Sequence, residues 1–302
     1  SAAAAARQAV LVACHAGLGL PVLALRELLP ERDHRALCVC EGEDGATRFV
    51  KANCKPEYVF QELGDVIKAE GHCEVHHRNV KLPPLGASDF TLFSGGFHIS
   101  TFAGLDTPAA RLALVHGSCS DPYHLMHRYI AAQRPCIAIL EIRGLSEIPQ
   151  AQRPGALKCL VDGIDGSSGG AALGSSAAWG FRQLDGYGFE LLELCAKDFG
   201  LPLAGVYAFA VLVREDCGGQ AAAELAVGLA RALRGLLPRT SVGELLLDNS
   251  SARLLQVVKT EWKRTDRAVE SSDAKASAKR PFDAKAISLH AFAKEAKDLG
   301  IK

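Results

Sequence analysis

The chain has 302 residues, of which 48% are hydrophobic and 23% are charged, so it can bury a substantial core and its composition excludes bulk disorder. Its 34 basic residues balance its 34 acidic ones, which excludes a global field that would draw the protein onto phosphate backbones or acidic lipids. The ten cysteines lie in apolar runs and are typical of small buried side chains, which favours a reducing compartment inside the cell. Because no run of about 20 apolar residues is present, we expect no membrane insertion.

Apolar runs of strand length alternate with helical patterns over the first two thirds of the chain. The run at 9–14 ends before Gly17 and Gly19, and a helical period follows at 22–29. Strands that alternate with helices predict a doubly wound, mainly parallel sheet, which is a Rossmann-like α/β fold. The predicted strands are 9–14, 36–40, 90–93, 136–140 and 206–213, and the predicted helices are 22–29, 46–53, 109–115, 122–132 and 188–198.

The composition changes along the chain predict three regions. A main domain covers 1–214, and its Gly- and Ser-rich stretch at 162–176 is predicted to be a flexible loop. A short Ala- and Leu-rich helical region follows at 215–258. From 259 onward the chain is rich in Lys, Ala, Asp and Ser, which predicts a charged linker that leads to an amphipathic C-terminal helix at 284–299.

The two glycines after the first strand and the acid after the second strand indicate a nucleotide site. Gly17 and Gly19 allow a tight turn, and the helix that follows them offers partial positive charge at its N-terminus. Glu41 stands where a carboxylate can hydrogen-bond a ribose diol. A dinucleotide fingerprint needs a third glycine where Pro21 and Val22 stand, so S-adenosylmethionine (SAM) fits better than NAD. The alternative is a simple turn beside a surface acid.

Several segments between about 10 and 214, taken in order, resemble the serial motifs of the cytosine carbon-5 DNA and RNA methyltransferases. Residues 9–28 resemble the first SAM motif, with His15 where an aromatic residue is usual. Residues 40–43 resemble the second motif and 64–66 the third. The resemblance implies a Rossmann-like, SAM-dependent methyltransferase fold. The cofactor contacts that it implies are His15, Gly17, Leu18, Gly19, Glu41 at the ribose and Asp65 at the adenine.

The residues that this family uses for catalysis are replaced. The segment that resembles the family's Pro-Cys-Gln motif has Phe97 at the position of the nucleophile, and a phenyl ring cannot attack carbon 6 of cytosine as a thiolate does. The segment 137–145 resembles the Glu-Asn-Val motif and keeps only its acid, Glu141. The polar trio of the eighth motif, Gln-x-Arg-x-Arg in the family, has become Leu203, Gly205 and Tyr207.

The missing nucleophile predicts a catalytically inactive methyltransferase-like protein, or pseudoenzyme, that serves as a binding or structural subunit in a larger protein assembly. Glu141 would then be a relic. The alternative is an active SAM-dependent methyltransferase in which a nitrogen or oxygen of nucleic acid or another substrate attacks the methyl group directly. A relocated thiol at Cys119 and a nucleotide-binding enzyme of another class are further alternatives. A cavity filled by Phe97, Leu203 and Tyr207 would favour the subunit, whereas an open one would favour catalysis.

Three other kinds of residue cluster are explained without a functional site. The histidine and cysteine groups lack the tight paired spacing of zinc sites, so no metal is expected. The glycine-rich stretch lacks the Gly-Lys that follows a phosphate loop, and the basic linker is interpreted as solvated, with nucleic-acid contact as the alternative. The residues concerned are His116, Cys119, His124 and His127, then Cys73, His76 and His77, the glycine-rich stretch 166–170, and Lys275, Lys279 and Arg280.

Overall fold

The computed structural model describes residues 8–86, 89–99, 122–162, 180–199 and 206–236. The chain divides into two compact units, 1–240 and 241–302, and all described residues belong to the first. The strands are β1 (Ala9–Cys14), β2 (His34–Cys40), β3 (Tyr58–Phe60), β4 (Glu70–Cys73), β5 (Arg78–Lys81), β6 (Phe90–His98), β7 (Ile137–Arg143), β8 (Tyr187–Cys195) and β9 (Val206–Arg214). The α-helices are α1 (Leu20–Leu28), α2 (Asp44–Asn53), α3 (Leu63–Lys68), α5 (Pro122–Gln133), α6 (Arg153–Asp162) and α7 (Gly219–Ala232).

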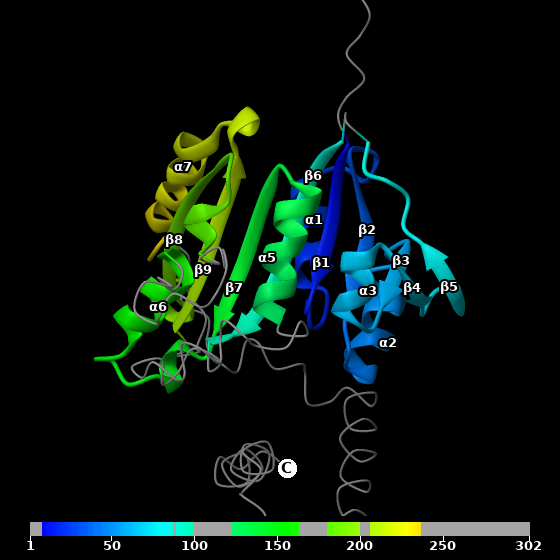
Figure 1. Ribbon diagram of the computed structural model, residues 1–302, viewed down its shortest axis with the longest axis horizontal. Helices are drawn as coiled ribbons and strands as arrows, with labels where there is room; N and C mark the ends of the chain where they lie inside the picture. Colours follow the sequence, from blue (N-terminus) through cyan, green and yellow to red (C-terminus); the bar gives the residue numbers. More distant parts are fainter. Residues whose placement is uncertain (1–7, 87–88, 100–121, 163–179, 200–205, 237–302) are drawn as a thin grey trace, which may run out of the picture. The chain divides into compact units, whose positions relative to one another are not determined.

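Seven of these strands form one sheet in the order β3-β2-β1-β6-β7-β9-β8, and β4 pairs with β5 in a separate hairpin (Figure 1). β9 runs antiparallel to both β7 and β8, while the other neighbours run parallel. Counted within the sheet, the order is 3-2-1-4-5-7-6 with an antiparallel last strand. This is the Rossmann-like arrangement of a SAM-dependent methyltransferase fold, so the predicted α/β fold class is confirmed.

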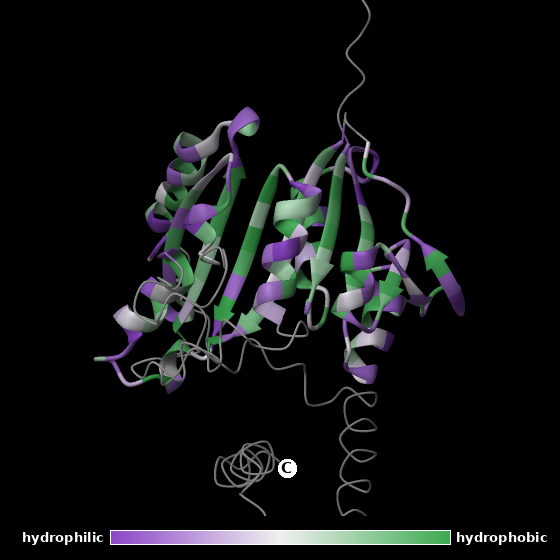
Figure 2. Cartoon of the chain, in the orientation of Figure 1, coloured by the Kyte–Doolittle hydropathy of each residue, from purple (hydrophilic) through white to green (hydrophobic). Residues whose placement is uncertain are grey.

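Helices cover both faces of the sheet. Val10 and Val12 of β1 belong to one apolar cluster and Leu11 and Ala13 to another, as alternation along a strand requires. Helices α3, α5 and α6 contribute to the first cluster, while α1, α2 and α7 pack on the opposite face. The strands are accordingly the most hydrophobic part of the fold in Figure 2. Burial on both faces explains why β1 is a continuous apolar run.

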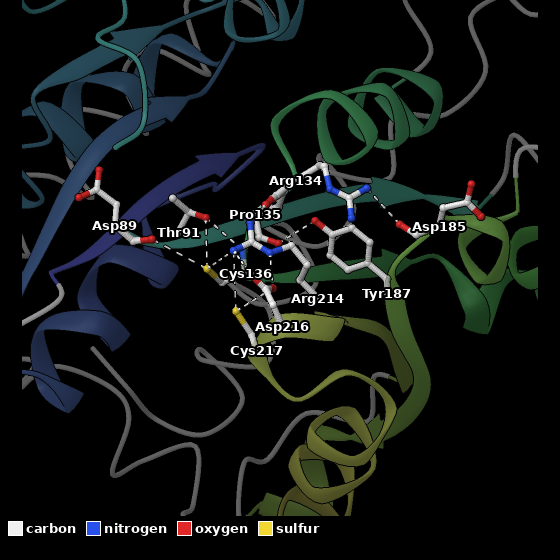
Figure 3. A network of polar contacts seen from close by, with 10 residues as sticks. All are labelled: Asp89, Thr91, Arg134, Pro135, Cys136, Asp185, Tyr187, Arg214, Asp216 and Cys217. Atoms are coloured by element: carbon white, nitrogen blue, oxygen red, sulfur yellow. Dashed lines mark hydrogen bonds and ion pairs between the residues drawn. The ribbon is translucent and has the colours of Figure 1, made fainter. Parts of the chain in front are cut away.

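A polar network fastens the amino end of β7 to the end of β9 (Figure 3). The Arg214 guanidinium donates to Asp216 at 2.6 Å and to the Cys136 sulfur at 3.5 Å, and it also reaches the backbone oxygen of Arg134. Burial raises the pKa of the neighbouring Cys217 thiol to about 11, so this thiol stays protonated at neutral pH. We interpret the network as structural, because a protonated thiol is a poor nucleophile.

Most predicted elements are confirmed with small shifts of their ends. β6 and β7 continue to His98 and Arg143, beyond the predicted ends at 93 and 140. The sequence interpretation missed β3, α3, α6 and the β4–β5 hairpin. The predicted helices at 109–115 and 284–299 lie outside the described residues, as does most of the predicted loop at 162–176. The domain limits 1–214, 215–258 and 259–302 stay predictions.

The predicted helix at 188–198 is wrong. Residues 187–195 form strand β8, which pairs antiparallel with β9, and a short 3-10 helix follows at Ala196–Phe199. Both faces of β8 are covered: Phe189 packs in one cluster and Leu192 in the cluster on the other face. A strand with two covered faces loses the strict alternation of apolar and polar residues, and its leucines then recur at a spacing that resembles a helical period.

None of the described helices is long and apolar enough to cross a membrane.

Candidate cofactor site

The carboxyl ends of the parallel strands meet at one edge of the sheet. The strand order reverses between β1 and β6, and open α/β sheets bind ligands at the carboxyl ends beside such a reversal. The loops continue the ladder beyond the strands, because the His15 N–H donates to the Cys40 oxygen and the Glu41 N–H to the Phe60 oxygen, both at 2.9 Å. His15 and Glu41 are therefore fixed side by side at this edge.

The turn between β1 and α1 has left-handed backbone at three positions. The φ angles are 50° at His15, 55° at Gly17 and 74° at Gly19. A Cβ on Gly19 would lie 2.5 Å from the Cys54 sulfur, so this glycine also lets the turn pack on the end of α2. At Gly17 an added Cβ would meet no described atom within 4 Å. The turn thus presents backbone closely to whatever occupies the space above Gly17.

Glu41 is a structural part of this turn and not a surface acid. Only 9% of the surface of Glu41 is exposed to solvent. One carboxylate oxygen accepts the Gly17 N–H at 2.8 Å and the other accepts the Glu43 N–H at 3.1 Å, while Thr47 donates to the Glu41 backbone oxygen at 2.7 Å. A carboxylate oxygen has two lone pairs, so each can accept a second hydrogen bond. The carboxylate can therefore hold the turn and still receive the hydroxyl groups of a ribose.

His15, in the same turn, has a buried ring nitrogen. In the described part of the chain, its Nε2 is buried and has no hydrogen-bond partner. Burial lowers the pKa of His15, Arg143 lowers it further, and the carboxylates of Glu41 and Glu62 oppose that shift. Glu62 follows β3 and Arg143 ends β7, and neither was singled out from the sequence. Glu62 is the first charged residue after the buried strand β3, which is the signal that would have found it, whereas Arg143 follows Glu141 in β7 and has no such signal.

The other two predicted cofactor contacts, Leu18 and Asp65, are not part of this arrangement. Leu18 is half exposed on the turn. Asp65 is on α3, and its carboxylate lies against Gly71 of β4, since a Cβ on that glycine would be 2.3 Å from the carboxyl carbon. The structure thus brings His15, Gly17, Gly19 and Glu41 together and places the Asp65 side chain against the β4–β5 hairpin. Their roles in cofactor binding stay predictions.

The position predicted for the nucleophile is filled by an aromatic cluster. Phe97 of β6 is 3% exposed, and its ring meets Tyr123 of α5 edge-on at 5.5 Å and Phe181 at 6.4 Å between centroids. The next buried side chain on this segment is Ile99, which is also not a nucleophile. The nearby thiol of Cys14 is held protonated, because burial raises its pKa well above the usual value. Cys119 lies outside the described residues.

Phe97 and Tyr207 do not fill one cavity together, so the arrangement that would have favoured the subunit is not formed by these two residues. Phe97 shares its face of the sheet with Ala208 and Ala210 of β9. Tyr207 alternates with Ala208 and therefore points to the opposite face, where α7 packs. Leu203 lies outside the described residues. Tyr123 and Phe181 are the partners that the sequence interpretation missed, because they come from distant segments with no local signal.

Glu141 and His98 lie at the same edge, on β7 and β6. Glu141 is half buried on the face opposite Phe97, over Gly96 of the neighbouring strand, with 3.6 Å between a Cβ on that glycine and Oε2. His98 Nε2 lies 3.2 Å from Glu147 Oε1. Gly144 (φ 81°) leaves room for the imidazole, since a Cβ there would be 2.2 Å from the ring. His98 is therefore held by a carboxylate and a glycine.

His124 and His127, from the group whose spacing was compared with a zinc site, lie on α5. Within the described residues, no group of three or more His, Cys, Asp or Glu side chains is arranged to hold a metal. His127 stacks on Phe181 with 5.9 Å between ring centroids. Burial lowers the pKa of His127 to about 4, against a smaller opposing hydrogen bond to the backbone of Gly180. His127 is therefore uncharged in the folded protein at neutral pH.

This burial gives an expected pH dependence of stability. Below about pH 6.5 the unfolded chain protonates His127 and the folded protein does not, so stability falls as the pH drops towards about 4, by up to about 3 kcal/mol. His127→Phe keeps the stacking on Phe181 and should lose this component. The measurement is urea unfolding at about pH 7 and about pH 4 for wild type and variant, with His72→Phe on an exposed histidine as control. Parallel pH profiles for wild type and His127→Phe would refute the assignment.

Comparisons with known proteins concern the fold. No protein-family model matches the sequence, and no curated protein matches it. A putative prophage-encoded DNA modification methyltransferase from E. coli is 14% identical over 69% of this chain and 47% of its own, with a TM-score of 0.39. The Dnmt2 methyltransferase of S. pombe is 12% identical over 69% and 49%, with a TM-score of 0.35. A Spodoptera frugiperda DNMT2 mutant is 9% identical over 69% and 51%, with a TM-score of 0.37. The chain spans about half the length of these proteins.

Proposed function

We propose that this chain is a methyltransferase-like protein that binds SAM at the carboxyl ends of β1 and β2 and does not methylate cytosine. The observation that carries the proposal is the Glu41 carboxylate, which is buried and bonded to the Gly17 N–H at 2.8 Å. An acid that is fixed to the glycine turn of a Rossmann-like fold is suited to a ribose diol. The open space above Gly17 leaves room for the rest of the ligand.

The residues at this edge fit an adenosine ligand that carries a methionine group. Glu41 would accept the ribose hydroxyls, and the start of α1 would lie at the polar end of the ligand. The N–H groups of Gly17 and Gly19 hold the turn itself, because they donate to Glu41 and to the Ala16 oxygen. Nε2 of His15, which is buried and has no hydrogen-bond partner among the described residues, would be satisfied by a ligand group that reaches it. When bound, SAM supplies an activated methyl group.

The loss of the nucleophile supports a role without catalysis. Methylation at carbon 5 of cytosine needs a thiolate that adds to the ring, and the segment that resembles the nucleophile loop has Phe97 buried among aromatic rings. The Cys14 thiol, at the end of the adjacent strand, is protonated through burial. We infer from this loss that the protein acts as a binding or structural subunit of a larger assembly.

One observation favours the second candidate, an active methyltransferase for a nitrogen or oxygen nucleophile. His98 stands at the end of β6 with Nε2 3.2 Å from the Glu147 carboxylate. A carboxylate that orients an imidazole is a common arrangement for a general base. Such a base would take the proton of a substrate group that attacks the methyl directly, and the reaction then needs no enzyme thiolate.

The first test is calorimetric titration of the purified protein with SAM and with S-adenosylhomocysteine. We expect micromolar binding of both, since the adenosine contacts are common to the two ligands. Absence of binding at millimolar concentrations would contradict the proposal and leave only a scaffold role. A second measurement uses SAM with a tritiated methyl group and DNA or tRNA. No incorporation is expected, and incorporation that His98→Gln abolishes would establish the second candidate instead.

A further inference from the structure

Helix α7 has apolar residues on both sides. Ala223 and Val227 are buried against β8 and β9. On the outer side, Leu225, Leu229 and Leu233 are 64%, 59% and 51% exposed at a spacing of four residues. A helix that is hydrophobic all round is normally covered on both sides. Figure 1 shows α7 at one end of the sheet, beside the edge strand β8.

The outer face of α7 combines large and small residues in a self-complementary order. Besides the leucines it contains Ala221, Gly228 and Ala232, which lie on the same side at helical spacing. If a second α7 runs antiparallel about a two-fold axis between Gly228 and Leu229, each Leu225 faces Ala232 of the other copy. Each Leu229 then faces Gly228, where an added Cβ meets no described atom within 4 Å. Leu225 and Leu229 are therefore level with small residues of the other copy, whereas Leu233 is level with Glu224.

The charges beside this face are complementary in the same arrangement. Glu224 and Arg231 lie on one flank of the outer face. In the antiparallel pair Glu224 lies two residues, or about 3 Å along the helix axis, from Arg231 of the other copy. The two-fold axis makes this pair twice. Opposite charges at the flanks of a helical seam select the partner and its direction.

We propose that the outer face of α7 is the interface of a homodimer in which two α7 helices pack antiparallel around Gly228 and Leu229. Such an interface is isologous, because both copies use the same residues. It shares no residue with the edge that holds Glu41, so it stands independently of the proposed SAM binding.

The oligomeric state of the full chain tests the interface. Sedimentation over a range of protein concentrations is expected to show a monomer–dimer equilibrium. Leu229→Glu places two carboxylates at the two-fold axis and should weaken the dimer at least about 100-fold. Leu28→Glu changes a leucine that is 78% exposed on α1 and should leave the dimer unchanged. Either a wild-type monomer at about 100 µM or a dimer that Leu229→Glu leaves intact would overturn the proposal.

A charge exchange tests the antiparallel direction. Glu224→Arg brings two like-charged pairs together and should weaken the dimer about tenfold. The double variant Glu224→Arg/Arg231→Glu restores opposite charges only between two copies, so it should regain wild-type affinity. Failure of the double variant to recover would overturn the antiparallel pairing. If residues 237–302 or another protein cover this face instead, the wild type stays monomeric, which also overturns the proposal.

Discussion

Replacement of Glu41 by alanine is expected to weaken SAM binding at least about 100-fold, which corresponds to about 3 kcal/mol. Two effects combine. The ribose hydroxyls lose a charged acceptor, and hydrogen bonds to charged groups contribute about 1.5–3 kcal/mol each. The N–H groups of Gly17 and Glu43 also lose their acceptor, so the turn that approaches the ligand is no longer fixed. Calorimetric titration of the variant measures the combined loss.

Controls separate the ligand from the turn. Glu43→Ala removes an exposed neighbouring carboxylate but keeps the N–H that Glu41 accepts, and it should bind SAM as the wild type does. Glu41→Ala should also unfold at a lower temperature without ligand, because a part-buried N–H is left unpaired. SAM affinity within threefold of wild type would refute the ribose role, while unchanged stability would refute the structural role.

The parts of the fold that could be predicted are those where burial alone decides the sequence. All six residues of β1 are buried, so the apolar run from Ala9 to Cys14 marks the strand directly. β3 has three residues, Tyr58–Phe60, and is too short to show any period. Its place beside β2 comes from tertiary pairing, which the local sequence does not contain.

The candidate site divides in the same way. Gly17 lies three residues after the end of β1, and Glu41 directly follows the end of β2. Because these two strands pair in parallel, their ends meet, which brings the two residues together. The left-handed backbone of His15 has only a weak signal in the residue type, because few non-glycine residues adopt it, although histidine does so more often than most. Tyr123 and Phe181 reach Phe97 from other segments, and no spacing in the sequence indicates that contact.

The misread strand β8 also contains the position with the largest expected effect on stability. Gly188 was predicted to begin a helix, but it lies in β8 under the first turn of α7. A Cβ at this position would be 2.0 Å from the Gln220 nitrogen and 2.3 Å from the carbonyl carbon of Gly219. Both neighbours are backbone atoms, and the Gln220 side chain accepts the Phe189 N–H at 3.0 Å. The glycine is thus required for the close docking of α7.

Gly188→Ala is therefore expected to lower the free energy of unfolding by about 3 kcal/mol, because α7 must lift away from β8 to admit one methyl group. Urea unfolding measures the change. The matched control is Gly45→Ala in α2, where an added Cβ meets no described atom within 4 Å. Alanine suits a helix better than glycine, so this control should gain about 0.5–1 kcal/mol. A loss below about 1 kcal/mol for Gly188→Ala would mean that α7 can shift and still keep its packing on Leu192 and Val211. In that case the close approach of α7 to β8 would not be the reason why position 188 is a glycine.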